Sequence, residues 1–177
     1  MRRGARRTRH SGAISRRIKR LSSKPMDRPR PVIAPDLKQR LSARLAASPA
    51  LSWLNPELCA LELDYAEIRL PYREALTNGS GTVHGGVLAT LADTAVAFAL
   101  STNFDGKMGF ATADLTIHFL RRARGDVTAR ARIVKKGKRV NVGDVEIVDS
   151  GGRAVSRVLA TFLLTTSSFD YAPEGKE

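Results

Sequence analysis

The segment from His84 to Ser101 sets the strongest constraint on how this chain folds. After two glycines it carries Ala, Leu, Val and Phe on every side of a helix. A helix of this kind must be buried all round, inside a domain or in a membrane. Its apolar part, residues 87–100, contains an aspartate and two threonines and is shorter than the roughly 18 apolar residues of a membrane span. We therefore predict a central helix, about 27 Å long, that a sheet encloses.

Alternating apolar and polar residues predict the strands of that sheet. One is expected before the helix, over residues 61–72, and four follow it, over 111–119, 127–133, 140–148 and 154–164. Turn residues at 124–126, 136–138 and 150–152 separate the last four, which favours antiparallel pairing. Asp36 begins a short helix with Leu37, Leu41 and Leu45 on one face. The expected fold class is α+β, with a sheet around one long helix.

The 177 residues suit one domain, which we place at residues 36–168. It follows a basic, Pro-rich segment over residues 1–35 that we expect to be disordered, and precedes a tail over residues 169–177. The net charge of +13 belongs mostly to the first segment, because residues 1–25 hold ten Lys and Arg and no acid. The rest of the chain carries 20 basic and 17 acidic residues. The domain is therefore nearly balanced in charge.

Three interpretations of residues 1–25 stay open. The segment could contact nucleic acid or an anionic membrane, although no aromatic residue for base stacking is interleaved with its charges. It could be a transit peptide, or an upstream extension with Met26 as the true start.

Cys59 is the one cysteine, which excludes an internal disulfide and favours a reducing compartment. We expect a cytoplasmic protein, or a matrix protein if residues 1–25 are a transit peptide, and a buried Cys59.

The spacing Asn78-x5-His84-Gly85-Gly86-x6-Asp93 carries the chemistry. The first N–H groups of a helix have no partner within it and favour negative charge, so they can polarise a carbonyl. Glycine at that position lets a ligand approach the backbone closely. Asp93 is a carboxylate in the middle of an apolar helix, where an unpaired charge is costly. It is either paired with a neighbour or kept for a reaction, and the glycines nearby favour the reaction.

This pattern, within "LTNGSGTVHGGVLATLADTAVAFAL", resembles the PaaI-type, 4-hydroxybenzoyl-CoA-thioesterase-like branch of the hotdog superfamily. The resemblance continues through "FATADLTIHFLRRARGD", "KKGKRV" and "DSGGRAVSRVLATFLL", and covers about residues 50–166. It implies the hotdog fold, a curved antiparallel sheet around a central helix, and a homodimer or dimer of dimers. It also implies hydrolysis of an acyl-CoA to the free acid and CoA.

The resemblance also implies roles for individual residues. Asn78 and the Gly85 N–H would hold the thioester oxygen, and His84 would order their turn. Asp93 would be the nucleophile or the base for water, and the family's Ser or Thr after the helix falls on Thr112. One departure is Leu120-Arg121-Arg122, where relatives often have Leu-Arg-Pro. An alternative is an acyl-CoA sensor without catalysis, which has no need of Asp93.

Helix geometry adds a requirement that the resemblance does not supply. Gly85 and Asp93 are eight positions apart, about 12 Å along one helix. A carboxylate must come within roughly 3–3.5 Å of the carbon that it attacks. We therefore expect Gly85 of one subunit to act with Asp93 of another. We expect Gly86, Lys136, Lys138 and Arg139 to help bind the substrate and its phosphates, and we expect no metal and no cofactor.

Overall fold

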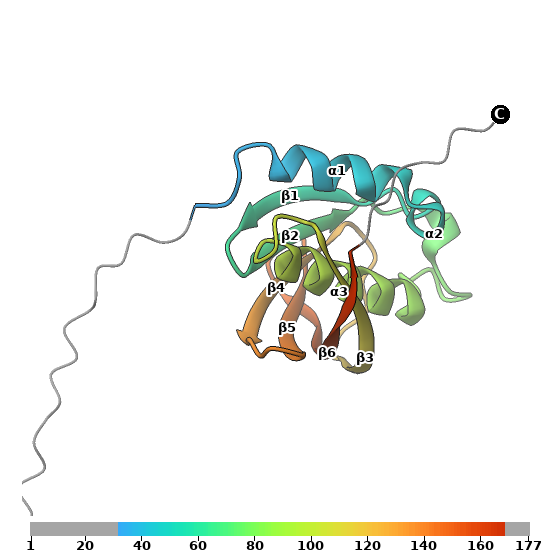
Figure 1. Cartoon of the computed structure of the whole chain (residues 1–177). Helices are drawn as coiled ribbons and strands as arrows, with labels where there is room; N and C mark the ends of the chain where they lie inside the picture. Colours follow the sequence, from blue (N-terminus) through green and yellow to red (C-terminus); the bar gives the residue numbers. More distant parts are fainter. Residues whose placement is uncertain (1–31, 169–177) are drawn as a thin grey trace, which may run out of the picture.

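A six-stranded antiparallel sheet curves around one long helix, α3 (Gly85–Ser101), as Figure 1 shows. This computed structural model describes residues 32–168. The strand order is β1-β2-β4-β5-β6-β3, which confirms the expected α+β class and hotdog architecture. The strands are β1 (Glu57–Glu62), β2 (Tyr65–Leu70), β3 (Met108–Phe119), β4 (Val127–Lys135), β5 (Val140–Asp149) and β6 (Ala154–Ser168). The other helices are α1 (Leu37–Ala47), α2 (Pro49–Ser52) and the short 3-10 turn η1 (Glu74–Leu76).

Helix α3 is buried on nearly all sides and packs mainly against β2, β4 and β5. One glycine lets the sheet come this close. A Cβ at Gly143 would lie 2.4 Å from Cγ1 of Val96, so no larger residue fits between β5 and the helix. In the part of the chain that the structure describes, no helix is long and apolar enough to cross a membrane. The interpretation of α3 as a core helix is therefore confirmed.

The sequence prediction of a single strand over residues 61–72 is wrong. The structure has two strands there, and Glu62 of β1 pairs with Tyr65 of β2 across a two-residue turn. Asp64 in that turn has a φ of 61°, in the left-handed region that Asp tolerates better than most residues. An Asp inside an apparently continuous strand was therefore the signal for a hairpin.

A bulge in β3 decides which side chains reach the helix. Thr112 pairs with Phe162 and Asp114 pairs with Thr161, so Ala113 is an extra residue in β3. Bulges of this kind change which face the following side chains occupy. As a result Thr112 contacts the helix, while Leu115 and Ile117 pack on the core as well. Strict alternation would put Thr112 on the opposite face from Leu115.

The structure tests the predictions for helix α1 and for Cys59 in the N-terminal half of the domain. Helix α1 buries Leu37, Leu41 and Leu45, as the pattern predicted. Cys59 is exposed, so the expectation that it is buried is wrong. It lies on edge strand β1 at a register shift between Leu58 and Ala60, where side chains leave the regular alternation. The interpretations of residues 1–25 and of residues 169–177 lie outside the described residues.

Candidate active site

The start of α3 is held by the side chain of His84. This residue is the N-cap, and its Nδ1 accepts a hydrogen bond of 3.0 Å from the N–H of Gly86. The backbone N–H of His84 donates to the carbonyl of Leu76, and its carbonyl accepts from Val87 and Leu88. A cap of this kind satisfies one of the helix's free N–H groups. His84 therefore orders the turn, and the N–H of Gly86 is already used.

Gly85 differs from Gly86 in one respect that matters for chemistry. Its N–H has no hydrogen-bond acceptor among residues 32–168, although it lies at the positive end of α3. The ring of Phe119 covers the glycine, because a Cβ there would lie 3.0 Å from the ring's Cζ. A side chain at this position would therefore require Phe119 to move. The free donor of the helix start is the N–H of Gly85.

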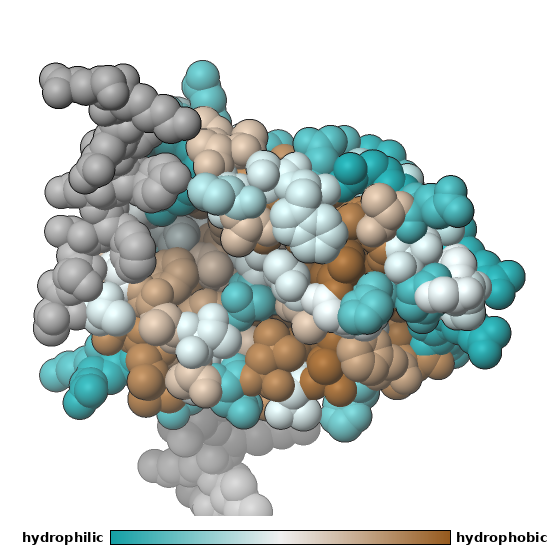
Figure 2. All heavy atoms as spheres, turned by 90° about the vertical axis from the view of Figure 1, so that its right-hand side faces the viewer, coloured by the Kyte–Doolittle hydropathy of each residue, from teal (hydrophilic) through white to brown (hydrophobic). Residues whose placement is uncertain are grey.

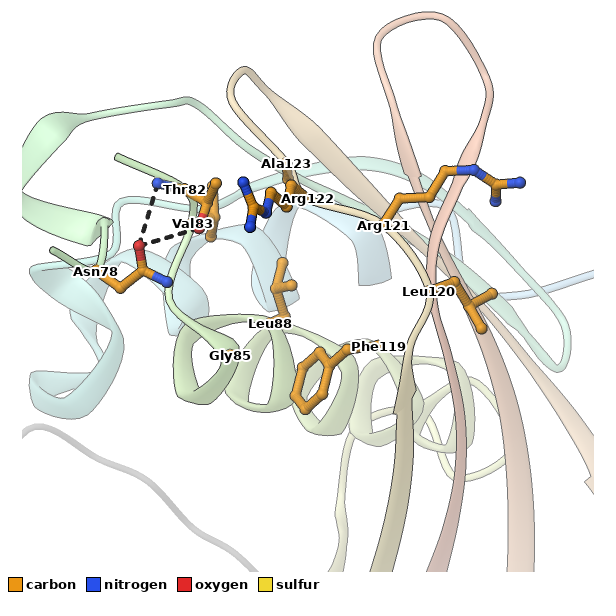
Figure 3. Close-up of a pocket in the computed structure, with 10 residues that line it drawn as sticks. All are labelled: Asn78, Thr82, Val83, Gly85, Leu88, Phe119, Leu120, Arg121, Arg122 and Ala123. Carbon is orange, nitrogen blue, oxygen red and sulfur yellow. Dashed lines mark hydrogen bonds between the residues drawn. The ribbon is translucent and has the colours of Figure 1, made fainter. Parts of the chain in front are cut away.

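Asn78 is clamped through its side-chain oxygen. Oδ1 accepts four hydrogen bonds: from the N–H and Oγ of Ser80 at 3.0 and 2.7 Å, and from the N–H and Oγ1 of Thr82 at 3.3 and 3.0 Å. The N–H of Asn78 also donates to the carbonyl of Thr82 at 2.8 Å, which closes the loop. With its oxygen saturated, the amide must point its nitrogen the other way. Nδ2 has no partner among the described residues, and Figure 3 shows it on the side of the start of α3.

A pocket of about 380 Å³ lies where these two free donors meet. Asn78 and Gly85 line it, with Leu88 and Phe119 as apolar walls. Arg122 extends toward Val83 in Figure 3 and makes no hydrogen bond or ion pair with the described residues. Arg121 is also at the pocket, but its guanidinium donates to the carbonyl of Ala154 at 2.8 Å. One end of the pocket thus offers two neutral donors, and its rim offers Arg122, a cation without a partner in the described part of the chain.

Asp93 lies two helical turns further along α3, away from this pocket. Oδ1 accepts a hydrogen bond of 2.8 Å from Oγ1 of Thr112 on β3, so the structure brings these two sequence candidates together. Burial raises the pKa of the Asp93 carboxyl, and the Thr112 hydroxyl opposes part of that increase. No cation among residues 32–168 is paired with the carboxylate. The alternative of a structural ion pair at Asp93 therefore finds no partner there.

The remaining sequence candidates lie elsewhere in one chain. Lys136 donates to Asp64 at 2.8 Å and to Asn103 at 3.0 Å, beyond the C-terminal end of α3. Lys138 and Arg139 share its hairpin between β4 and β5. These three basic residues are thus at the opposite end of α3 from Gly85. Among the described residues, no group of three His, Cys, Asp or Glu is placed to hold a metal ion.

Sequence reasoning missed one residue at the pocket, Phe119, and noted another, Arg122. Phe119 covers Gly85, but in the sequence it is only one more apolar residue of a strand. Arg122 was visible as a departure from the family's Leu-Arg-Pro, and the departure is a signal for a charge at this position. Its place at the pocket depends on how the end of β3 meets the loop before α3, which the local sequence does not encode.

Comparisons with known proteins identify the family to which this chain is similar. A model of the family described as the thioesterase superfamily matches residues 80–156. The acyl-coenzyme A thioesterase PaaI of Escherichia coli is 35% identical over 105 residues, 58% of this chain and 73% of that protein. A supposed esterase of Halobacterium salinarum is 43% identical over 86 residues, 46% of this chain and 57% of the relative. The solved structure of a Haemophilus influenzae thioesterase superposes with a TM-score of 0.67 at 26% identity, covering 72% of this chain and 90% of that one.

The fold and these similarities define a class, the thioester hydrolases with a hotdog fold. The chain belongs to the thioesterase superfamily and, within it, to the PaaI-type branch. The expectation drawn from the Asn78, His84-Gly85-Gly86 and Asp93 spacing is confirmed at the level of the family and the enzyme class.

The raised pKa of Asp93 predicts how its replacement changes stability. A carboxyl whose pKa is raised by folding contributes stability below its unfolded-state pKa and loses that contribution as the pH rises through its folded-state pKa. Asp93→Asn keeps the shape without the charge, so it should raise the melting temperature at pH 7 to 8. The gain should shrink as the pH falls toward 4, because Asp93 takes up a proton at a higher pH than usual and then resembles Asn. The measurement is the melting temperature of both proteins across this pH range. A stability gain of the variant over wild type that is smaller at pH 8 than at pH 4 would contradict the prediction.

Proposed function

We propose that the protein hydrolyses an acyl-CoA to a free acid and CoA at a site shared by two copies of the chain. Gly85 N–H and Asn78 Nδ2 of one copy hold the thioester oxygen. Asp93 of the second copy attacks the carbonyl carbon, or removes a proton from the water that attacks it. The C–S bond then breaks, and the thiolate leaves and takes up a proton. If Asp93 has attacked directly, water then hydrolyses the anhydride formed on Asp93, which releases the free acid and restores the carboxylate. The observation that carries the proposal is the pair of free donors at one pocket, with a carboxylate on α3 that is paired with no cation of residues 32–168.

The two donors suit the charge that develops on the thioester oxygen. Both are neutral, preorganised and without a competing partner in the described residues, which is what stabilisation of an oxyanion requires. The positive end of α3 adds to the same field. Asp93 is held by Thr112 and is paired with no cation of residues 32–168, so it stays available as nucleophile or base.

The spacing along α3 supports a second copy. Gly85 and Asp93 lie on one continuous helix, so about 12 Å of axial rise separates them. No side-chain rotamer of an Asp spans that gap to a carbon held at Gly85. A copy related by a two-fold axis brings the start of one α3 to the middle of the other, and generates two equal sites.

Strand β3 offers the surface for that copy. It is an edge strand of twelve residues that pairs with β6 on one side only, among the described residues. Figure 2, which views the side of the molecule where β3 lies, shows apolar side chains gathered on this face. Phe119 and Leu120 at the end of β3 are 55% and 50% exposed, and Leu159 on neighbouring β6 is 49% exposed. Long uncovered edges with apolar side chains are interaction sites.

Arg122 supports a phosphate-bearing thioester. Its guanidinium is at the rim of the pocket and is free of any carboxylate partner in the described residues. The similarity to an acyl-coenzyme A thioesterase points to the same class of substrate. The alternative of a sensor without catalysis leaves Asp93 unexplained, because binding alone does not need a costly carboxylate inside an apolar helix.

The shared site predicts complementation between two inactive variants. Asn78→Ala removes one oxyanion donor, which typically costs on the order of 10²–10³ in rate, and Asp93→Asn removes the carboxylate. A mixed dimer has one site with both lesions and one intact site. After equimolar exchange, thioesterase activity should return to about a quarter of wild type. Free-thiol release is the measurement, with exchange followed by two affinity tags.

A matched control should lose activity on subunit exchange, where the two single variants should regain it. When wild type is mixed with the double variant Asn78→Ala, Asp93→Asn, each mixed dimer has one lesion in each of its sites. Activity should therefore fall from about half to about a quarter as exchange proceeds. If exchange is complete and this activity stays at half, while the two single variants fail to complement, the site lies within one chain.

The clamp on Asn78 predicts that Thr82 acts on the reaction only through the amide. Thr82→Val keeps the shape and removes one of the four donors to Oδ1, so the amide loses part of its fixed orientation. The value of kcat should fall by about tenfold or less, and Thr82→Ser should restore it. In an Asn78→Ala background the same substitution should have no further effect. An equal loss in both backgrounds would show that Thr82 affects stability rather than Asn78.

A further inference from the structure

A second pocket lies one helical turn beyond Asp93, and no function is yet assigned to it. Its volume is about 210 Å³, and most of its walls are apolar. Ala97, Phe98, Met108 and Phe110 come from α3 and β3, and Leu41 and Arg44 come from α1. We call it the Phe98 pocket. Helix α1 precedes residues 80–156, the part that matches the family model, so one wall of the pocket lies outside that match.

The Phe98 pocket adjoins the Asp93–Thr112 pair along both elements. Ala97 is four residues after Asp93 on α3, on the same helix face and about 6 Å along the axis. Phe110 is two residues before Thr112 on β3, on the same face of the strand, since the bulge comes only after Thr112. The ring of Phe110 packs edge-on against Phe162, with centroids 5.6 Å apart, which fixes this wall. The acyl chain of a thioester whose carbonyl carbon lies beside Asp93 would therefore face this pocket.

One side chain in the Phe98 pocket does not suit a purely apolar occupant. Arg44 is partly buried, and both terminal nitrogens of its guanidinium donate to the carbonyl of Gly106 at 3.2 Å. It has no ion pair with a carboxylate among residues 32–168, whereas Arg40 on the same helix pairs with Asp36 and Asp105. A guanidinium has five donors, so some remain for a ligand. An unpaired, partly buried cation at the wall of an apolar pocket indicates an oxygen-bearing ligand.

We propose that the Phe98 pocket receives the acyl group, and that Arg44 selects acyl groups with an oxygen acceptor at the far end. This inference rests on the proposed function. A cavity of about 150 Å³ accommodates benzene, so this pocket suits a group of roughly six to eight heavy atoms rather than a long fatty chain. The chemical class is a medium-length acyl-CoA with a terminal hydroxyl or carboxylate.

Four CoA thioesters test the assignment: acetyl-CoA, hexanoyl-CoA, 6-hydroxyhexanoyl-CoA and adipoyl-CoA. Wild type should prefer at least one of the two oxygen-bearing substrates to hexanoyl-CoA by roughly tenfold in kcat/KM. Arg44→Met keeps the side-chain length without the charge and should abolish that preference, with hydrolysis of hexanoyl-CoA kept or raised. Lys38→Met, a cation of the same helix outside the pocket, is the matched control and should leave all four values unchanged.

Ala97→Leu tests the location separately from Arg44. It fills part of the Phe98 pocket, so it should lower kcat/KM for all three six-carbon substrates by about tenfold and leave acetyl-CoA within about twofold. An equal loss for acetyl-CoA and the longer substrates overturns the assignment. A loss of the dimer also overturns it, because a side chain of the second copy would then be the occupant.

If wild type hydrolyses hexanoyl-CoA as well as its oxygen-bearing analogues, the role of Arg44 is wrong although the proposed function stands. If it hydrolyses no thioester, the proposed function itself fails, and this inference fails with it.

Discussion

Helix α3 has apolar side chains on every face, and a sheet curved around it removes most of them from water. The absence of a side chain at Gly143 lets β5 approach Val96, and the other strands follow the same curvature. Enclosure has two chemical consequences. It leaves the N–H of Gly85, at the end of the helix, without an acceptor among residues 32–168, and it surrounds Asp93 with apolar groups that raise its pKa. The two ends of the proposed site thus come from a single packing requirement.

Enclosure also costs stability at one position. A carboxylate in the middle of a buried helix opposes folding at neutral pH, and the Thr112 hydroxyl only partly offsets that cost. Folding alone would favour a neutral residue of the same shape at position 93. Such conflicts between stability and a local rule are typical of functional sites. The same argument applies with less force to Arg44, a cation without a carboxylate partner in the described part of the chain.

Local patterns made most of this fold predictable, because they report which faces are buried. The apolar helix, the leucines of α1 and the spacing of Asn78, His84, Gly85 and Asp93 are all features of short segments. The errors come where one residue changes the register. Asp64 turns one expected strand into a hairpin, and a register shift at Cys59 turns that side chain outward.

Long-range contacts are the part of the site that no local pattern contains. Phe119 over Gly85 joins the end of β3 to the start of α3, and Arg44 on α1 reaches a carbonyl beyond the end of α3. The bulge at Ala113 is a feature of one strand, but it depends on how β3 pairs with β6, which is a long-range contact. Without it, Thr112 and Leu115 would not face the helix together. The orientation of Asn78, in contrast, depends on residues only two and four positions away, and a turn rich in Ser, Thr and Gly was a readable signal.

The central claim is that two copies of the chain build each site. A crystal structure of the Asp93→Asn variant with a non-cleavable ketone analogue of an acyl-CoA tests it most directly. The account predicts the ketone oxygen within about 2.7–3.1 Å of Gly85 N and Asn78 Nδ2 of one subunit. The carbonyl carbon should then lie beside residue 93 and Thr112 of the other subunit. A ketone oxygen held at Gly85 with the nearest residue 93 on the same chain, or an analogue bound away from Asn78, would contradict the account.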